Sequence, residues 1–311
     1  MRMSAETFLV TGCAGFIGSH MVRRLLAEGF AVAGVDDFST GSRANMTDFY
    51  DKIRFIEGDL SFSKVAEEAV RGVDRIIHLA SIPSVPRSID NPLESAQSSI
   101  MATVSLLDAA WRAGVKRVVQ ASSSAVYGDV EGLAVETLPT APLSPYAAAK
   151  LAQENYARVF CLCRGLDAVS LRYFNVFGAG QNPDSDYAAV IPKFISLMLA
   201  GRQPVIFGDG TQTRDFTHVD NVVDANLKAS LSIAPLDGEA INVGNGGGTS
   251  VNNLVAELNR IMGSDIQPVH VSVRAGDILH SRSDIGKAEK LIAFKPLVGF
   301  AEGLAKVVLN Q

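Results

Sequence analysis

The chain has 311 residues, and its hydrophobic fraction of 47% is enough to build a large buried core. Its net charge of −5 argues against a general nucleic-acid or anionic-membrane binder, because both attract basic proteins. Three cysteines (Cys13, Cys161 and Cys163) and five histidines show no zinc-ligand spacing, so we expect reduced thiols and no metal. Without a leader-like segment or a run of 18 apolar residues, the sequence predicts a soluble cytoplasmic protein.

Apolar runs and helical patterns alternate along the first 175 residues. The predicted strands lie in "TFLVTG", "AVAGVDD", "IRFIEGDL", "DRIIHLAS", "KRVVQASSS" and "LDAVSLRYFNVFG". The predicted helices lie in "SHMVRRLLAEG" and "SKVAEEAVRG", from residue 93 to residue 114, and from "SPYAAAK" onward. Strand–helix alternation with near-continuously apolar strands predicts an α/β fold with a doubly wound parallel sheet of the Rossmann type.

After about residue 175 the elements become shorter and richer in glycine and proline. We therefore expect one domain over residues 1–175 and a smaller α/β domain over 176–311. The stretch "TRDFTHVDNVVDANLKASL" leaves open a return of residues 215–245 to the first domain. The cluster "GNGGGTS" predicts a turn before a helix that begins near Val251.

Three glycines follow the first predicted strand at the start of the first helix. Gly12, Gly15 and Gly18 allow a tight turn, a close approach of a pyrophosphate and packing of helix on strand. Asp36 ends the second strand 18 residues after Gly18, where a carboxylate accepts hydrogen bonds from ribose hydroxyls and repels a 2′-phosphate. The pattern predicts an NAD site rather than an NADP site, with Asp59 as a candidate for the adenine edge.

The stretch "SPYAAAK" places a tyrosine and a lysine on one face of a helix. Pro145 can open a helix, the alanines favour it, and residues four apart share a face, so Tyr146 and Lys150 point the same way. In isolation the pair is more often an exposed helix start whose lysine is solvated, so its role depends on the rest of the chain.

Together the motifs resemble the extended short-chain dehydrogenase/reductase family, and within it the nucleotide-sugar 4-epimerases. The resemblance covers residues 7–297 and rests on "TGCAGFIGSH", "VDDFSTG", "GDL", "IHLAS", "ASSSAVYG", "SPYAAAK", "LRYFNVFG", "TRDFTHVDN" and "RAGD". It implies that residues 1–175 bind NAD and that residues 176–311 bind a UDP-sugar.

The resemblance also implies roles for a catalytic trio. Tyr146 would exchange a proton with the sugar 4-hydroxyl, Lys150 would hold the nicotinamide ribose and favour tyrosinate, and Ser123 would bind the same hydroxyl. Related dehydratases and decarboxylases carry acids after Ser123, whereas this chain has Ser124 and Ala125. We therefore expect reversible C4 oxidation and epimerisation without elimination.

Further site residues follow from the same motifs. The expected NAD contacts are Gly12, Gly15, Phe16, Ile17, Gly18, Asp36, Asp37, Ser39, Gly41, Asp59, Leu60, Leu79, Ala80, Ser81, Ser122, Tyr146, Lys150 and Tyr173. The expected substrate contacts are Ser84, Ser123, Ser124, Tyr146, Asn175, Ala189, Val190, Arg214, Arg274, Asp277 and Ser281. Arginine suits the diphosphate because its planar fork binds phosphate in a bidentate way. Ser99 and Pro83 depart from the residues usual in relatives.

The identity of the sugar stays open between two readings. Ser281 occupies a position where a small side chain admits an N-acetyl group in the family, so we expect UDP-GlcNAc and UDP-GalNAc as well as UDP-Glc and UDP-Gal. The alternative is a UDP-glucuronate 4-epimerase, although uronate-acting relatives tend to have Thr at Asn175 and Arg near Asn182. A non-catalytic dinucleotide sensor predicts a broken Tyr/Lys pair, which this chain does not have. Two helices near 93–113 and 147–163 resemble those that pair across the family's dimer, which implies a homodimer.

Overall fold

A computed structural model of the protein describes residues 6–130, 132–181, 189–273 and 279–309. Its centre is a parallel sheet with the strand order β12-β7-β5-β4-β1-β2-β3, which confirms the predicted Rossmann-type α/β fold. The bounds of these strands are β1 Thr7–Thr11, β2 Ala31–Asp36, β3 Arg54–Glu57, β4 Arg75–His78, β5 Arg117–Ser123, β7 Ala168–Tyr173 and β12 Ala240–Val243.

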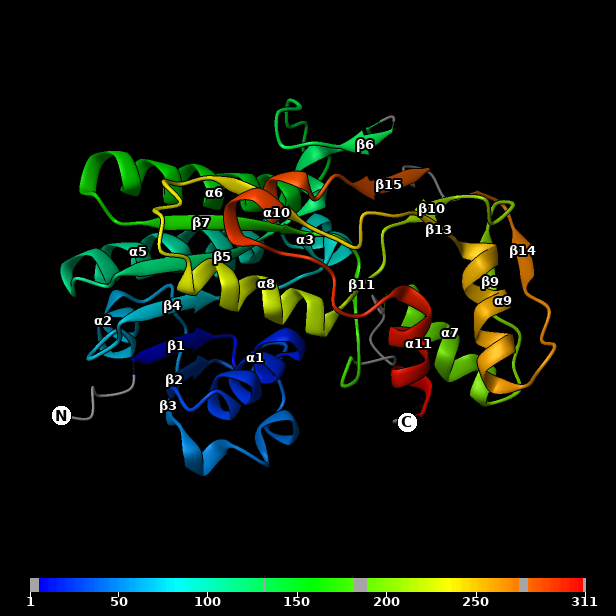
Figure 1. Ribbon diagram of the computed structural model, residues 1–311, viewed down its shortest axis with the longest axis horizontal. Coiled ribbons are helices and arrows are strands. Elements are labelled where there is room, and N and C mark those ends of the chain that lie inside the picture. The colour runs from blue at the N-terminus through cyan, green and yellow to red at the C-terminus, as the bar shows by residue number, and fades with distance from the viewer. Residues whose placement is uncertain (1–5, 131, 182–188, 274–278, 310–311) are drawn as a thin grey trace.

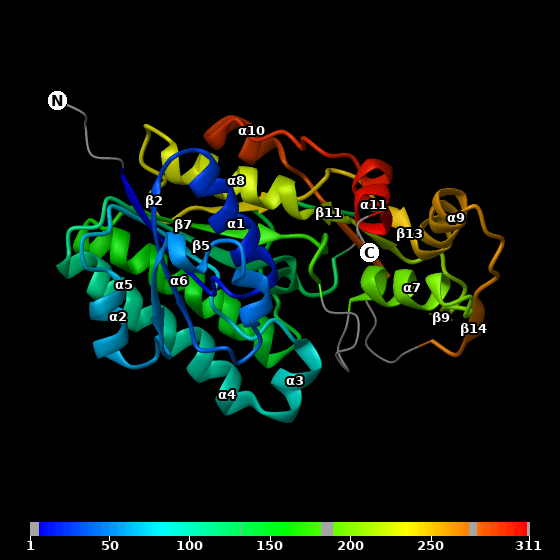
Figure 2. The same cartoon turned by 90° about the horizontal axis from the view of Figure 1, so that it is seen from below.

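Helices cover both faces of this sheet (Figures 1 and 2). One face carries α2 (Ser63–Ala69), α5 (Ala102–Arg112) and α6 (Pro145–Arg164), and the other carries α1 (Phe16–Ala27), α8 (Val219–Leu231) and α10 (Gly286–Ile292). Successive side chains of a strand point to opposite faces of the sheet, so each strand contributes to an apolar core on both faces. In β1, Leu9 packs on the α2–α5–α6 side, and Phe8 and Val10 pack on the α1–α8 side. Burying each such side chain stabilises the fold by about 1.5–3 kcal/mol.

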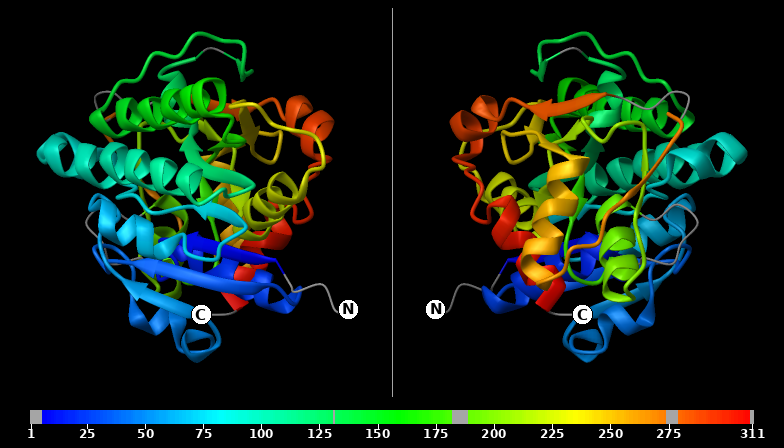
Figure 3. Two further views of the ribbon diagram at one scale, coloured as in Figure 1. Left: turned by 90° about the vertical axis from the view of Figure 1, so that its left-hand side faces the viewer. Right: turned by 90° about the vertical axis from the view of Figure 1, so that its right-hand side faces the viewer.

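The second half of the chain builds a smaller unit beside the sheet (Figure 3). Its core lies among α7 (Val190–Leu199), α9 (Val251–Met262), α11 (Phe300–Leu309) and β9 (Val205–Phe207), which pairs with β14 (Val269–Val271). The helix expected near Val251 begins at that residue. A four-stranded sheet in the order β13-β10-β15-β6 joins Thr249–Ser250, Thr213–Arg214, His280–Ser283 and Leu133–Ala134. A shorter pair joins β8 (Val176–Phe177) to β11 (Thr217–His218).

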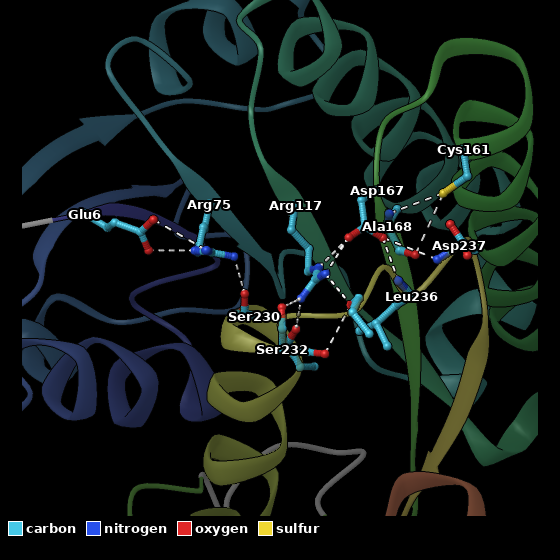
Figure 4. A network of polar contacts seen from close by, with 12 residues as sticks. Glu6, Arg75, Arg117, Cys161, Asp167, Ala168, Ser230, Ser232, Leu236 and Asp237 are labelled. Carbon is cyan, nitrogen blue, oxygen red and sulfur yellow. Dashed lines mark hydrogen bonds and ion pairs between the residues drawn. The ribbon is translucent and has the colours of Figure 1, made fainter. Parts of the chain in front are cut away.

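Residues 219–243 lie with the large sheet rather than with the smaller unit. β12 pairs in parallel with β7, and α8 packs against α1, β4 and β5. Two arginines at the first positions of β4 and β5 hold the C-terminal end of α8 (Figure 4). Arg75 donates to the carbonyl of Ser230, and Arg117 donates to the carbonyls of Ala229, Ser232 and Ala234. Cations at a helix C-terminus satisfy its last carbonyls and oppose its dipole.

The helix expected over residues 93–114 is not regular. It runs as α4 (Pro92–Ala96), a π-helical turn (Gln97–Met101) and α5, after a short α3 (Val85–Asp90). The wide turn directs Ser99 inward, where its buried hydroxyl lies 3.0 Å from that of Ser81 at the end of β4. Wide turns of this kind often mark functional sites, and this one lies beside the cleft described next.

Candidate active site

The glycine loop after β1 forms a cradle at the N-terminus of α1. Gly12 has a φ of +66°, and a Cβ there would lie 3.0 Å from the Cα of Ala80. A Cβ at Gly18 would collide with the carbonyl of Gly12, and Gly15 is the N-cap of α1. Only glycine fits these contacts, and the free N–H groups of the first helical turn suit a pyrophosphate.

Asp36 ends β2 beside this loop. Its carboxylate accepts hydrogen bonds from the N–H groups of Ala14 and Phe38, each at 2.8 Å, and the residue is only 7% exposed. Burial raises the pKa of Asp36, and the hydrogen bonds from Phe38 and Ala14 oppose that rise. A carboxylate held this firmly suits ribose hydroxyls and disfavours a second phosphate.

The three predicted catalytic residues meet on the floor of the cleft. Tyr146 and Lys150 lie one turn apart on α6, whose N-cap Ser144 accepts a hydrogen bond from the N–H of Ala147 at 3.1 Å. Ser123 at the end of β5 forms a hydrogen bond with the Tyr146 phenol. The buried Lys150 donates to the carbonyl of Ala121 at 3.0 Å, and its Nζ lies 5.9 Å from the centre of the Tyr146 ring.

Burial dominates the protonation of this trio. It raises the pKa of Tyr146, and the hydrogen bond from Ser123 only partly opposes the rise. It lowers the pKa of Lys150 to about 8, against the attraction of Glu154. The resemblance implied that the nearby charge of Lys150 favours the tyrosinate form of Tyr146. Among the protein's own groups, burial outweighs that effect, and the Tyr146 phenol is protonated at neutral pH.

A single cleft of about 1120 Å³ runs past the trio and gathers nearly all of the predicted site residues. The predicted residues that line it are Gly12, Gly15, Phe16, Ile17, Gly18, Asp36, Asp37, Ser39, Asp59, Leu60, Leu79, Ala80, Ser81, Ser84, Ser122, Ser123, Ser124, Tyr146, Lys150, Tyr173, Asn175, Ala189, Arg214 and Ser281. Gly41 and Val190 are not among the lining residues: Gly41 packs against Ala14, and Val190 begins α7 on the smaller core. Arg274 and Asp277 lie outside the described residues.

The far end of the cleft is built by the smaller sheet. Arg214 on β10 pairs in register with Ser281 on β15, so both side chains share one face. Asn175 has a φ of +22°, an unusual conformation that asparagine tolerates, and it lies in the cleft where β7 ends. Ser84 caps α3 by accepting from the N–H of Arg87 at 3.2 Å, which leaves its own O–H to donate.

Sequence reasoning missed a buried polar chain beneath the cleft. Thr11 accepts from the N–H groups of Leu79 and Ala80, so its O–H donates to Nδ1 of His78 at 2.7 Å. Nε2 of His78 therefore carries the proton and donates to Thr103 at 3.0 Å. Burial, with a smaller contribution from the charge of Lys150, lowers the pKa of His78 to about 3 and keeps the ring neutral. No spacing in the sequence joins these residues, because three separate elements bring them together.

Other ligand types find little support in the described residues. Among them, no three histidine, cysteine or acidic side chains gather where they could hold a metal ion. Within the same residues, none of the helices has both the length and the apolarity that a membrane crossing requires.

Comparisons with known proteins agree with this geometry. The model of the NAD dependent epimerase/dehydratase family matches residues 8–244. A UDP-glucose 4-epimerase of Mycolicibacterium smegmatis is 39% identical over 305 residues, which are 96% of each chain. The structure of a UDP-N-acetylglucosamine 4-epimerase from Methanobrevibacter ruminantium M1, in complex with UDP-N-acetylmuramic acid, is 39% identical with a TM-score of 0.93 over 99% of this chain and 98% of that one. A UDP-glucuronate 4-epimerase of Thermodesulfobacterium geofontis is 34% identical over 97% of this chain and 94% of the relative.

The chain belongs to the NAD-dependent epimerase/dehydratase family of extended short-chain dehydrogenases/reductases, as the resemblance predicted. Its cofactor is NAD, and the glycine cradle with Asp36 fits that group. Among family members the chain groups with the UDP-sugar 4-epimerases, which are isomerases.

Proposed function

We propose that the protein inverts C4 of a UDP-hexose, including N-acetylated hexoses. The observation that carries the proposal is the Ser123–Tyr146–Lys150 trio in the cleft, combined with the absence of an acidic side chain at Ser124 and Ala125. Without an acid there, neither water nor a carboxylate group is eliminated, and the substrate loses and regains only the proton of its 4-hydroxyl and the hydride of C4.

Each residue of the trio has one task in this reaction. NAD+ supplies the reversible hydride acceptor and, when bound, a positive charge near the trio. Tyr146 takes the proton of the 4-hydroxyl and returns it after the sugar has turned to its other face, while Ser123 holds the same oxygen. Lys150, as a cation, favours the tyrosinate that this exchange requires.

Arg214 supports the choice of a nucleotide-sugar diphosphate. Its guanidinium donates to the carbonyl of Thr213 at 2.9 Å, which fixes it against the cleft. Behind it, Asp215 accepts from Ser283, Asn245 and Gly246 and so ties the strand ends together. A fixed guanidinium at the end of the cleft suits a phosphate.

Ser281 supports the acceptance of an N-acetyl group. It lies in the cleft directly beside Arg214 and carries the smallest hydroxyl side chain. Ser281→Tyr would fill this space, so we expect loss of activity on UDP-GlcNAc with UDP-Glc activity retained. Ser281→Ala keeps the space and should leave both activities close to those of the parent.

The experiment is incubation of the protein with UDP-Glc, UDP-GlcNAc and UDP-glucuronate, followed by chromatographic separation of the epimers. Conversion of the two neutral sugars supports the proposal. Conversion of UDP-glucuronate alone would replace it with the uronate epimerase, and a Ser281→Tyr variant that keeps both neutral activities would refute the steric argument.

We also propose a homodimer through the outer side of α4 and α6. Leu93 on α4 is 82% exposed and Leu162 on α6 is 74% exposed, and Met101 in the π-helical turn and Val159 on α6 are about half exposed. Large apolar side chains along adjacent helices are typical of a covered interface. Sedimentation should give a dimer for the parent and a monomer for Leu162→Glu, whereas exposed Leu309→Glu should leave the dimer intact.

A further inference from the structure

A second charged group lies behind Lys150 and takes no direct part in the proposed reaction. Glu154 follows Lys150 by one turn of α6 and is 7% exposed. Its carboxylate accepts a hydrogen bond from Ser122 at 2.5 Å and two from Arg172 at 2.8 and 2.7 Å. Three elements thus converge on one carboxylate, because Ser122 lies one residue before the end of β5 and Arg172 lies near the end of β7.

The position of this carboxylate is strongly determined. The guanidinium of Arg172 also lies over the ring of Tyr127, with its Cζ 4.6 Å from the ring centre, and this contact further restricts its orientation. Ser122 is adjacent to Ser123, so the same strand end presents one hydroxyl to Tyr146 and the next to Glu154. A shift of Glu154 would therefore move both sides of the trio.

Stability alone is a weak reason for this pair. Removing two charges from water costs several kcal/mol each, and well-packed apolar residues often replace a buried ion pair at no loss. A carboxylate one turn from a buried ammonium has a second effect, because it stabilises the charged form of that lysine.

We propose that Glu154, fixed by Arg172 and Ser122, is a positioning residue that holds Lys150 in its protonated form during catalysis. The proposal rests on the proposed epimerase function for its effect on rate, but not for its effect on Lys150 itself. Neither Glu154 nor Arg172 lines the cleft, so both act through Lys150 rather than on the substrate.

The groups that face Lys150 leave Glu154 as the carboxylate that compensates it. On its own helix lie Tyr146 and Glu154; β5 contributes the carbonyl of Ala121; β4 contributes the neutral His78; β7 contributes Arg172, which is paired. Burial lowers the pKa of Lys150 to about 8, and Glu154 opposes that effect. The ammonium is therefore present below about pH 8 and is lost as the pH rises through that value.

Glu154→Gln tests the proposal because it keeps the shape and removes the charge. The titration of Lys150 is followed by NMR in protein with isotope-labelled lysine, with Lys150→Met to assign the signal. We expect the Lys150 midpoint to fall by about one pH unit. Its protonated fraction at pH 8 would then fall about fivefold, and the alkaline limb of kcat should move with it.

Two control variants separate charge from folding. Glu154→Gln with Arg172→Met removes both charges, so thermal stability should recover while the Lys150 midpoint stays below that of the parent. Asp167→Asn breaks the comparable buried pair with Arg117 at the other end of the sheet, where the two ions lie 2.6 Å apart. It should lower thermal stability and leave the Lys150 midpoint unchanged.

The outcomes also separate this proposal from the proposed function. An unchanged Lys150 midpoint in Glu154→Gln, or a midpoint that recovers with stability in the double variant, would overturn it. A lowered midpoint in a protein that epimerises no UDP-sugar would support the role of Glu154 and reject the epimerase function.

Discussion

Buried arginines form clusters at both ends of the central sheet, and the two clusters serve different purposes. At the amino ends of the strands, Arg75 and Arg117 bind Glu6, Asp167 and the last carbonyls of α8 (Figure 4). At the carboxyl ends, Arg172 binds Glu154 directly behind Lys150. The first cluster closes the fold around a returning segment, and the second lies where parallel strands place a ligand site.

The comparison shows that the effect of a buried arginine–carboxylate pair depends on the groups that surround it. Arg117 faces carbonyl oxygens at the end of α8, so its loss removes donors from that helix end. Arg172 faces a carboxylate that lies one turn from Lys150, which we propose as the catalytic lysine. Changes at the amino end should therefore affect folding, and changes at the carboxyl end should affect rate and pH dependence.

The largest expected effect is at the carboxyl end. Tyr146→Phe should lower epimerase activity by about 10²–10⁴ or more, since general acid–base catalysis supplies that factor. Thermal stability and NAD binding should remain near those of the parent, because the ring is retained. Coupled assays and calorimetry measure both, and activity within a few-fold of the parent would reject the role of Tyr146.

The matching change at the amino end is Arg117→Met. It removes the cation that pairs with the half-buried Asp167 and the donor to the carbonyls of Ala229 and Ser232 at the end of α8, so we expect a loss of about 3–5 kcal/mol in the free energy of unfolding. Activity per folded molecule should be unchanged. Denaturant unfolding gives the free energy of unfolding, and active-site titration gives the activity per folded molecule. A stable variant with altered kcat would contradict the comparison.

Lys116→Met is the matched control, because Lys116 precedes Arg117 and its ion pairs are exposed. Its loss should lower the free energy of unfolding by less than about 1 kcal/mol.

A smaller effect is expected at Asp36, a carboxyl-end carboxylate that binds backbone N–H groups rather than an arginine. Asp36→Asn removes the charge that repels a 2′-phosphate, so the preference for NAD+ over NADP+ should fall about tenfold. Calorimetry with both cofactors measures this ratio. An unchanged ratio would mean that Asp36 does not face the ribose.

The sequence predicted the parts of this molecule that short spacings encode. The glycine cradle and the Tyr146–Lys150 pair each lie within one turn or one helix, where period and propensity determine geometry. The parallel sheet followed from the alternation of apolar runs, which is also a local property.

The parts that it did not predict depend on contacts between distant elements. His78 meets Thr11 and Thr103 across 67 and 25 residues, and Arg172 meets Glu154 between a strand and a helix. The π-helical turn at residues 97–101 was also not predicted, because one extra residue in a single turn does not change the apolar pattern enough to be recognised. Arrangements of this kind become visible only when strand order and register are known.

The smallest expected effects come from two single hydrogen bonds at opposite ends of the sheet. Ser122→Ala removes one donor from Glu154, and Cys161→Ala removes the sulfur that accepts from the N–H of Ala168 at 3.2 Å. Each should cost about 1 kcal/mol or less, because a buried hydrogen bond contributes about 0.5–1.5 kcal/mol net. Their effects on the site should differ: Ser122→Ala removes one of the three hydrogen bonds that hold Glu154, so the alkaline limb of kcat should shift slightly toward lower pH, whereas Cys161→Ala should leave it in place. If the two variants have equal stability and equal pH profiles of kcat, the comparison between the two ends of the sheet fails. The hydrogen bond near Lys150 would then have no more effect on the site than the distant one.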